Sequence, residues 1–254
     1  MAKVIAVNNQ KGGVAKTTTC LSLGASLAEM GLTVLVVDLD PQAHLTMSLG
    51  IQPEKLHRTI GDVLLGHLSM MSVSRESPVF DLDVAPSNQG LALVDKLLYQ
   101  QNDYEFRLQK KIRAMDDYYE IIIIDCPPSF NTLTLNALTA SDLLIIPIQC
   151  EYYAAQSLPR IINLAQKVRQ KTNATLAYKL LVTMYDGRNR VCRLIYEQLQ
   201  ESMSDLLYDT IIEIDTKLKE SPAFGLPITQ YAPETRGARQ YRSLAQELMN
   251  HYDQ

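Results

Sequence analysis

Three features follow one another at the start of this chain. They are a short apolar run, a loop that contains glycine and lysine, and a segment with helical spacing of apolar residues. The run is Val4–Val7, the loop is 11–18 (KGGVAKTT) and the helical segment covers 20–30. A tight turn frees backbone N–H groups, a helix N-terminus adds partial positive charge, and Lys16 adds a full charge. The order predicts a strand, a phosphate-binding loop and a helix, with Thr17 offering a hydroxyl of the kind that ligates Mg²⁺.

Apolar runs and helical segments alternate along the rest of the 254 residues, without an internal repeat or a domain linker. Several runs are continuous Val, Ile and Leu, as expected for strands covered on both faces. We therefore predict one α/β domain over 1–254, with a doubly wound, mostly parallel central sheet and helices on both faces. The predicted strands are Val4–Val7, Thr33–Val37, Leu82–Ala85, Ile121–Ile124, Leu143–Pro147, Leu180–Met184 and Thr210–Glu213, and the predicted helices are Thr18–Met30, Thr59–Leu68, Gln89–Leu98, Tyr104–Met115, Thr132–Thr139, Ser157–Lys171, Arg190–Leu206 and Arg236–Tyr252.

Acidic residues follow two of the predicted strands. Asp38 and Asp40 end the run 34–37, and their side chains point the same way along an extended chain. Asp125 follows four isoleucines, so a carboxylate emerges at the end of a central strand, where it can hold the hydration shell of Mg²⁺. An Asp-x-Asp-Pro turn taken alone is more often structural, but beside a phosphate loop these acids indicate a nucleotide site.

The loop differs from the usual G-x-x-x-x-G-K-[ST] motif because Gln10 and Ala15 stand where that motif has glycines. It resembles instead the deviant motif K-G-G-x-x-K-[ST] of the ParA/MinD group of P-loop ATPases. This resemblance implies ATP and Mg²⁺ as cofactors, with the metal held by Thr17 and Asp125. The implied nucleotide-binding residues are Lys11, Gly12, Gly13, Val14, Ala15, Lys16, Thr17 and Thr18.

The same resemblance implies roles for two residues in hydrolysis. In the group, the extra lysine, here Lys11, reaches across a dimer interface to the partner's nucleotide, and the later aspartate, here Asp40, positions the attacking water. Ala15 adds a methyl close to the phosphates, which we expect to be tolerated if the backbone there is near helical values.

Three further segments extend the likeness over about 4–248, specifically to the small ParA/Soj-type partition ATPases. They are 146–154 (IPIQCEYYA), 218–228 (LKESPAFGLPI) and 237–241 (GARQY). The stretch 212–215 departs from the family, because IEID stands in place of I-P-R-N. This departure puts the adenine contacts in doubt and removes one arginine that could contact DNA.

Charge is unevenly distributed along a chain whose net charge is −4. Residues 160–195 hold eight Lys and Arg and one Asp, a net of +7. Such a block can be a solvated helix face, but in a family of DNA-binding switches it favours contact with phosphates. The candidate DNA contacts, chosen by charge and by the family's placement of this surface, are Arg188, Arg190, Lys217, Lys219, Arg239 and Arg242.

The resemblance implies a cytoplasmic, nucleoid-associated ATP hydrolase with weak activity of its own. It would dimerise when ATP is bound, bind DNA non-specifically in that state, and be reset by a ParB-like activator or a cargo adaptor. Its role would be chromosome or plasmid partition, or the positioning of another cargo.

Two other functions stay open from the sequence. A MinD-like ATPase that cycles on a membrane needs a basic amphipathic helix at the C-terminus, whereas 246–254 contains two acids and no Lys or Arg, so we expect no membrane partner. A metabolic P-loop enzyme needs an acceptor pocket that the sequence does not reveal. Four cysteines without C-x-x-C spacing predict buried free thiols.

Overall fold

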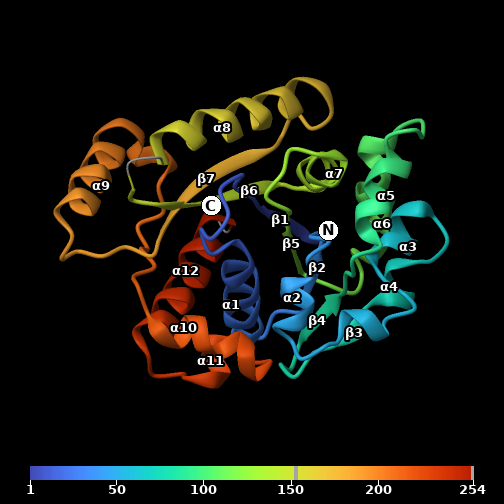
Figure 1. The fold of residues 1–254 in the computed structure, drawn as a ribbon, viewed down its shortest axis with the longest axis horizontal. Helices are drawn as coiled ribbons and strands as arrows, with labels where there is room; N and C mark the ends of the chain where they lie inside the picture. The colour runs from blue at the N-terminus through green and yellow to red at the C-terminus, as the bar shows by residue number, and fades with distance from the viewer. Residues whose placement is uncertain (152–153, 253–254) are drawn as a thin grey trace.

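One seven-stranded sheet forms the centre of the computed structural model, which describes residues 1–151 and 154–252 (Figure 1). The strands are β1 (Lys3–Val7), β2 (Val34–Asp38), β3 (Arg75–Glu76), β4 (Leu82–Ala85), β5 (Ile121–Asp125), β6 (Leu143–Gln149) and β7 (Ala177–Thr183). Their order across the sheet is β3-β4-β2-β5-β1-β6-β7, and every pairing is parallel except that of β3 with β4. The predicted mostly parallel sheet is therefore confirmed.

Helices cover both faces of the sheet (Figure 1). The helices are α1 (Lys16–Glu29), α2 (His44–Met47), α3 (Ile60–Leu65), α4 (Met70–Val73), α5 (Leu91–Leu98), α6 (Arg107–Ile112), α7 (Thr132–Ala140), α8 (Ala154–Lys171), α9 (Arg190–Met203), α10 (Thr216–Glu220), α11 (Ile228–Tyr231) and α12 (Arg236–Tyr252). Short 3₁₀ turns occupy Pro53–Lys55, Tyr104–Phe106, Arg113–Met115, Ser204–Leu206 and Ser221–Phe224.

The continuous apolar strands supply two separate buried cores because neighbouring side chains point to opposite faces. On β1, Ile5 and Val7 pack in one core with α1 and α12, whereas Val4 and Ala6 pack in the other core with α3 and α5–α8. Burial on both sides thus explains why these strands read as unbroken Val, Ile and Leu runs.

The phosphate loop and both groups of acids meet at one edge of the sheet. β1 and β2 flank β5, so that Val7 and Asp38 both lie in register with Asp125. The connection after β1 leads to β2 and the connection after β5 leads to β6, on the opposite side of β1. The two connections leave in opposite directions, and ligands of open α/β sheets bind at such a switch point.

The predicted strand Thr210–Glu213 is wrong. This segment runs beside β7 and makes only isolated bridges, such as Tyr185 with Glu213. Its backbone bonds β7 in places, since Ile212 N donates to the carbonyl oxygen of Val182 at 2.9 Å, but Glu247 Oε2 of α12 accepts Thr210 N at 2.9 Å and interrupts the ladder. The segment therefore pairs with β7 only in part, and no continuous strand forms.

The seventh strand is instead β3, a two-residue edge strand too short for sequence periodicity to reveal. Periodicity also did not indicate α2, α4, α10 and α11, each of four or five residues. All four cysteines are buried and free, as predicted. In the part of the chain that the structure describes, no helix has the length and apolarity needed to cross a bilayer.

Candidate nucleotide site

Donors from β6 and β7 hold the carbonyl groups of the loop between β1 and α1. Gln149 Nε2 donates to the carbonyl oxygen of Gly13 at 3.0 Å, and Thr183 Oγ1 donates to that of Val14 at 3.1 Å. In a planar trans peptide the following N–H points opposite to the carbonyl. The N–H groups of Val14 and Ala15 are therefore turned away from β6 and β7, toward the inside of the loop.

Asn9 fixes the first turn of this loop. Its side-chain oxygen accepts the backbone N–H of Lys11 at 3.0 Å, while its amide donates to the carbonyl oxygen of Pro147 at 2.8 Å. Gly13 then takes a φ of +76°, in the left-handed region that favours glycine. A Cβ added to Gly12 or Gly13 would meet no other atom within 4 Å, so the space beside both glycines is open.

Lys16 brings its charge to this space. The side chain starts the first turn of α1, is largely buried, and donates from Nζ to the carbonyl oxygen of Lys11 at 3.3 Å across the loop. The first N–H groups of α1 have no partner within the helix. Inward N–H groups, a helix N-terminus and an ammonium group converge, which is the arrangement that holds a polyphosphate.

Thr17 and Asp125 form the part of the site suited to a divalent cation. Thr17 Oγ1 donates to Asp125 Oδ2 at 2.6 Å. Among the described residues, no group bonds the other carboxylate oxygen, Oδ1, which is buried. Burial, with the nearby charge of Asp38, raises the pKa of Asp125 to about 8. A carboxylate with an unpaired buried oxygen next to a hydroxyl fits hydrated Mg²⁺, which would supply the missing positive charge.

Asp38 is fixed by the chain around it. Its carboxylate accepts Thr46 N at 2.9 Å, Thr46 Oγ1 at 2.6 Å and Asp40 N at 3.0 Å. The pKa of Asp38 is raised to about 6 because burial outweighs these hydrogen bonds. With its oxygens used in this way, Asp38 shapes the turn that carries Asp40.

Asp40 keeps more of its carboxylate available. Its Oδ1 accepts Gln42 N at 2.9 Å, and its backbone carbonyl accepts Ser87 Oγ at 2.9 Å. Both contacts hold the residue at the carboxyl edge of β2, near the end of β5. Sequence reasoning found Asp38 and Asp40 but missed Thr46 and Ser87, which position them.

Lys11 lies at the rim of the loop rather than inside it. Its Nζ contacts Gln149 Oε1 at 3.1 Å and also pairs with the Glu151 carboxylate. Both partners belong to the 146–154 segment singled out in the sequence, of which Tyr152 and Tyr153 lie outside the described residues.

A family model described as AAA domain (AAA_31) matches residues 2–178. The sporulation initiation inhibitor protein Soj of Bacillus subtilis is 41% identical over 249 residues, covering 98% of both chains. The chromosome partitioning protein ParA of Myxococcus xanthus is 36% identical, covering 98% of this chain and 88% of ParA. This chain belongs to the ParA/Soj family of partition ATPases.

A solved structure extends the likeness of this ParA/Soj family member to its whole fold. Cobyrinic acid a,c-diamide synthase from Mycobacterium smegmatis, with bound ATP analogue and magnesium, is 34% identical. The two superpose with a TM-score of 0.86, covering all of this chain and 96% of the other. The doubly wound P-loop fold is thus shared with a protein that binds this nucleotide and metal.

Ala15, at the position where the family often has glycine, departs from the expected backbone. Its φ is 65° and its ψ is 32°, so the residue is left-handed and not near right-handed helical values. This conformation costs an L-residue about 1–2 kcal/mol of free energy. The expectation was wrong because the loop, one residue before α1, still needs the left-handed turn that glycine adopts freely.

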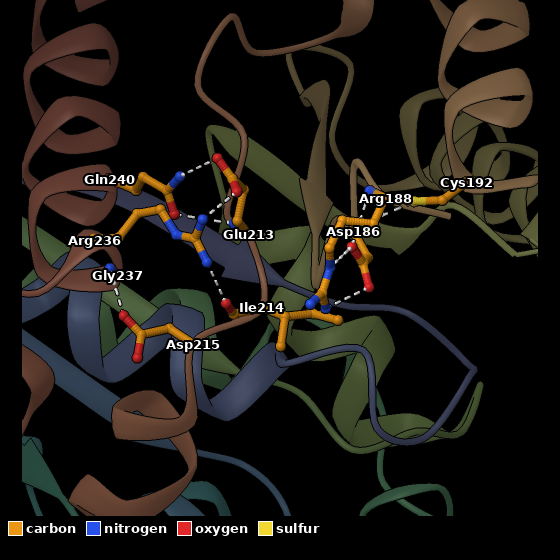
Figure 2. Close-up of polar contacts among 9 residues, drawn as sticks. All are labelled: Asp186, Arg188, Cys192, Glu213, Ile214, Asp215, Arg236, Gly237 and Gln240. Atoms are coloured by element: carbon orange, nitrogen blue, oxygen red, sulfur yellow. Dashed lines mark hydrogen bonds and ion pairs between the residues drawn. The ribbon is translucent and has the colours of Figure 1, made fainter. Parts of the chain in front are cut away.

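The IEID stretch of this ParA/Soj chain binds the start of α12 (Figure 2). Glu213 pairs with Arg236 at 2.6 Å, and Asp215 accepts Gly237 N at 2.9 Å. Their carboxylates are therefore engaged, while Ile214 stays 39% exposed. A pocket of about 410 Å³ lies between this stretch and the phosphate loop, and its lining includes Ala15, Thr18, Met184, Ile214, Leu218 and Pro222.

Three of the six cations predicted to bind DNA already pair with carboxylates of the same chain. Arg188 Nε and Nη2 donate to the two carboxylate oxygens of Asp186, each at 2.9 Å (Figure 2). Such bidentate pairs compensate the charge of the guanidinium. The other two pairs are Lys217–Glu220 and Arg242–Glu29, each at 2.7 Å.

The remaining three candidates lie on separate helices. Arg190 begins α9, Lys219 belongs to α10, and Arg239 on α12 donates to the carbonyl oxygen of Glu234 at 2.8 Å. None of these three forms an ion pair with a described residue. Contact of all six with DNA stays a prediction.

Proposed function

We propose that this protein is an ATP-driven switch that binds DNA without reading its sequence. ATP and Mg²⁺ close two subunits face to face, the pair binds DNA, and hydrolysis stimulated by a partner separates them. The role is chromosome or plasmid partition, or the positioning of another cargo, by a cytoplasmic, nucleoid-associated protein. The partner is a ParB-like activator or a cargo adaptor.

The position of Lys11 carries the proposal. Its ammonium group lies at the rim of the loop, bonded to Gln149 by a partly buried contact and to Glu151 by an exposed one, while Lys16 lies inside the loop. Exposed ion pairs are worth at most about 1 kcal/mol, so Lys11 is released easily. A second cation at the rim is better placed to contact the nucleotide of a facing subunit than the nucleotide of the same subunit, because Lys16 already contacts the phosphates of the same subunit's nucleotide.

The residues around the loop divide the work of hydrolysis. The inward N–H groups and Lys16 bind the phosphates, and Thr17 with Asp125 would hold Mg²⁺, which neutralises charge on the β- and γ-phosphates. Asp40 would orient a water molecule in line with the γ-phosphate and take a proton from it, while the water oxygen bonds to phosphorus, the bond from phosphorus to the bridging oxygen breaks, and ADP and phosphate leave. Orientation of this kind supplies much of the rate because little covalent chemistry is required of the protein.

The affinity for unrelated DNA duplexes tests the switch. We expect tight binding with a non-hydrolysable ATP analogue and Mg²⁺, and weak binding with ADP or without nucleotide. Light scattering under the same conditions should report a dimer only with the analogue. Equal DNA affinity in all three states, or a permanent monomer, contradicts the proposal.

One relative favours a second candidate function. The solved structure at 34% identity is named for a synthase that forms amides, which suggests a metabolic P-loop enzyme. Such an enzyme hydrolyses ATP in step with an organic acceptor. ATP turnover that DNA and a partner protein stimulate, without any carboxylic acid substrate, favours the switch, and turnover that requires an acceptor favours the synthase.

A further inference from the structure

Two of the four cysteines lie side by side beyond the ends of neighbouring strands. Gln149, the last residue of β6, is in register with Thr183, the last residue of β7, so Cys150 emerges beside the loop that leaves β7. That loop leads to α9, whose first turn carries Cys192. The thiols of Cys150 and Cys192 are hydrogen-bonded to one another, and no covalent bond joins them. The fold therefore brings two thiols from distant parts of the chain into direct contact.

The thiol pair, defined as Cys150 and Cys192, also differs from the other two cysteines in its access to solvent. Cys20 and Cys126 are 0% exposed, whereas Cys150 is 5% exposed and Cys192 is 6% exposed. Oxidation selects the cysteines that solvent can reach. A small oxidant can therefore reach the thiol pair after a minor movement of the loop, while the other two cysteines stay sealed inside the cores.

The turn before α9 places a hydrogen-bond donor on the sulfur of Cys192. Asp186 N donates to Cys192 Sγ at 3.4 Å (Figure 2). Asn189 caps the helix, because its side-chain oxygen accepts the N–H groups of Val191 and Cys192. An N–H donor and the positive end of a helix both favour negative charge on a nearby atom. Cys192 is therefore the member of the pair that is better suited to attack an oxidant.

Cys150 is suited to the second step of such a reaction. Burial raises the pKa of Cys150, and the neighbouring sulfur of Cys192 raises it further. Cys150 thus keeps its proton while an oxidant is attacked, and it already touches the sulfur that becomes oxidised. Its own proton is then available for the group that leaves that sulfur.

We infer that Cys150 and Cys192 form a redox-sensitive pair, which hydrogen peroxide converts into a reversible disulfide. Cys192 loses its proton and its sulfur attacks one peroxide oxygen, the O–O bond breaks, and a sulfenic acid and one water molecule form. Cys150 then attacks this sulfur, the S–S bond forms, the S–O bond breaks, and a second water molecule leaves with the proton of Cys150. The two thiols lose two electrons, and the peroxide that accepts them is reduced to water.

The disulfide would pull on residues that hold the phosphate loop. An S–S bond is about 2 Å long, shorter than any contact between two thiols, so the two segments must move together. Cys150 lies between Gln149, which donates to the carbonyl oxygen of Gly13, and Glu151, which pairs with Lys11. Displacement of Cys150 disturbs both contacts. We therefore expect the oxidised protein to lose its ATP-dependent dimer, an effect that rests on the proposed function.

Mass spectrometry of the whole chain tests the thiol pair without any assay of function. Hydrogen peroxide should lower the mass of the wild type by that of two hydrogen atoms, and dithiothreitol should restore it. A digest of the oxidised protein should contain one peptide pair linked through Cys150 and Cys192. Cys150→Ala and Cys192→Ala should each prevent this link, whereas the matched control Cys20→Ala should keep it.

Light scattering with the ATP analogue and Mg²⁺ tests the consequence of the disulfide. The reduced wild type should dimerise, the oxidised wild type should not, and dithiothreitol should return the dimer. Cys192→Ala should dimerise equally well before and after exposure to peroxide, because it cannot form the disulfide. Cys20→Ala should respond to peroxide as the wild type does.

The outcomes against the inference are distinct from failure of the proposed function. Four free thiols after peroxide, a disulfide between other cysteines, or a sulfinic or sulfonic acid at Cys192 without a disulfide overturns the redox pair. A Cys150–Cys192 disulfide that leaves dimerisation unchanged overturns its effect on the phosphate loop. Failure of the reduced wild type to dimerise with any nucleotide defeats the ATP-driven switch instead, and the mass measurement then still decides whether the pair forms a disulfide.

Discussion

The Thr17 hydroxyl lies 2.6 Å from one carboxylate oxygen of Asp125, whose other oxygen is buried and has no partner among the described residues. Burial keeps a proton on Asp125 up to about pH 8, and a cation that binds here would take the place of that proton. We expect Asp125→Asn to stabilise the nucleotide-free protein at pH 8 by at least about 1 kcal/mol, because a neutral amide replaces a desolvated charge. The same variant should lose the Mg²⁺-dependent rise in Tm with ATP analogue, as thermal unfolding can measure. A less stable Asp125→Asn protein contradicts this assignment.

Stability of the nucleotide-free protein should fall as pH rises. The pKa values of Asp38 and Asp125 are raised by burial from 3.8 to about 6 and about 8. The folded state therefore holds protons that the unfolded state has already released, and this stabilisation is lost as pH passes through the raised pKa values. Denaturant unfolding at pH 5, 6.5 and 8 should show the decline, and Asp125→Asn should reduce it. An equally steep decline in the variant would assign the pH dependence to other groups.

The sequence predicted the parts of the site that depend on local order along the chain. Val4–Val7, the loop and α1 follow one another directly, and the four isoleucines before Asp125 fit only a buried strand. Parallel pairing of the two strands then brings the loop and Asp125 to the same edge of the sheet. Contacts between distant segments were not predictable in this way. Thr46 on Asp38 and Thr183 on Val14 are ordinary residues in the sequence and acquire their roles only through packing.

The same limit explains the errors. A short segment such as Thr210–Glu213, with Ile211 and Ile212 at its centre, does not show in its sequence whether a full ladder forms, and the α12 side chains that accept its N–H groups lie more than 20 residues away. The pairing of Arg242 with Glu29 joins residues 213 positions apart. Candidate DNA contacts chosen by charge alone therefore include cations whose charge is already compensated.

Ala15→Gly should make the protein more stable. Glycine removes the strain of a left-handed alanine, about 1–2 kcal/mol, but loses about 0.5–1 kcal/mol through its freer unfolded chain. A net gain of roughly 0.5–1 kcal/mol in the free energy of unfolding should follow. Ala43, which has a φ of 54° before α2, provides a matched control outside the loop.

The two alanine variants should differ in nucleotide affinity. Ala15→Gly removes a methyl beside the phosphates and should bind ATP analogue as tightly as the wild type or more tightly, by calorimetry. Ala43→Gly should gain stability without any change in affinity. Weaker binding by Ala15→Gly would show that the methyl contacts the nucleotide favourably.

Lys11 and Glu151 should have opposite effects on dimerisation, although they form one ion pair. Lys11→Ala should keep ATP binding and lose both the ATP-dependent dimer and partner-stimulated turnover, because it removes the charge that we propose to contact the nucleotide of the facing subunit. Glu151→Gln frees Lys11 and should form the dimer at lower protein concentration, as mass photometry can measure. Normal stimulated turnover in Lys11→Ala would exclude the cross-dimer role.

Asp40 should separate nucleotide binding from hydrolysis. Asp40→Ala removes the carboxylate that we propose to orient water, so we expect turnover to fall roughly 10²–10⁴-fold with ATP affinity unchanged. The dimer should then persist with ATP itself, bound to DNA.

Asp40→Asn is the matched control, because its side-chain oxygen can still accept Gln42 N and hold the turn. Loss of turnover in both variants, with the dimer retained, assigns the defect to the missing negative charge. Activity in Asp40→Asn near that of the wild type would show instead that Asp40 acts only through the turn that it holds.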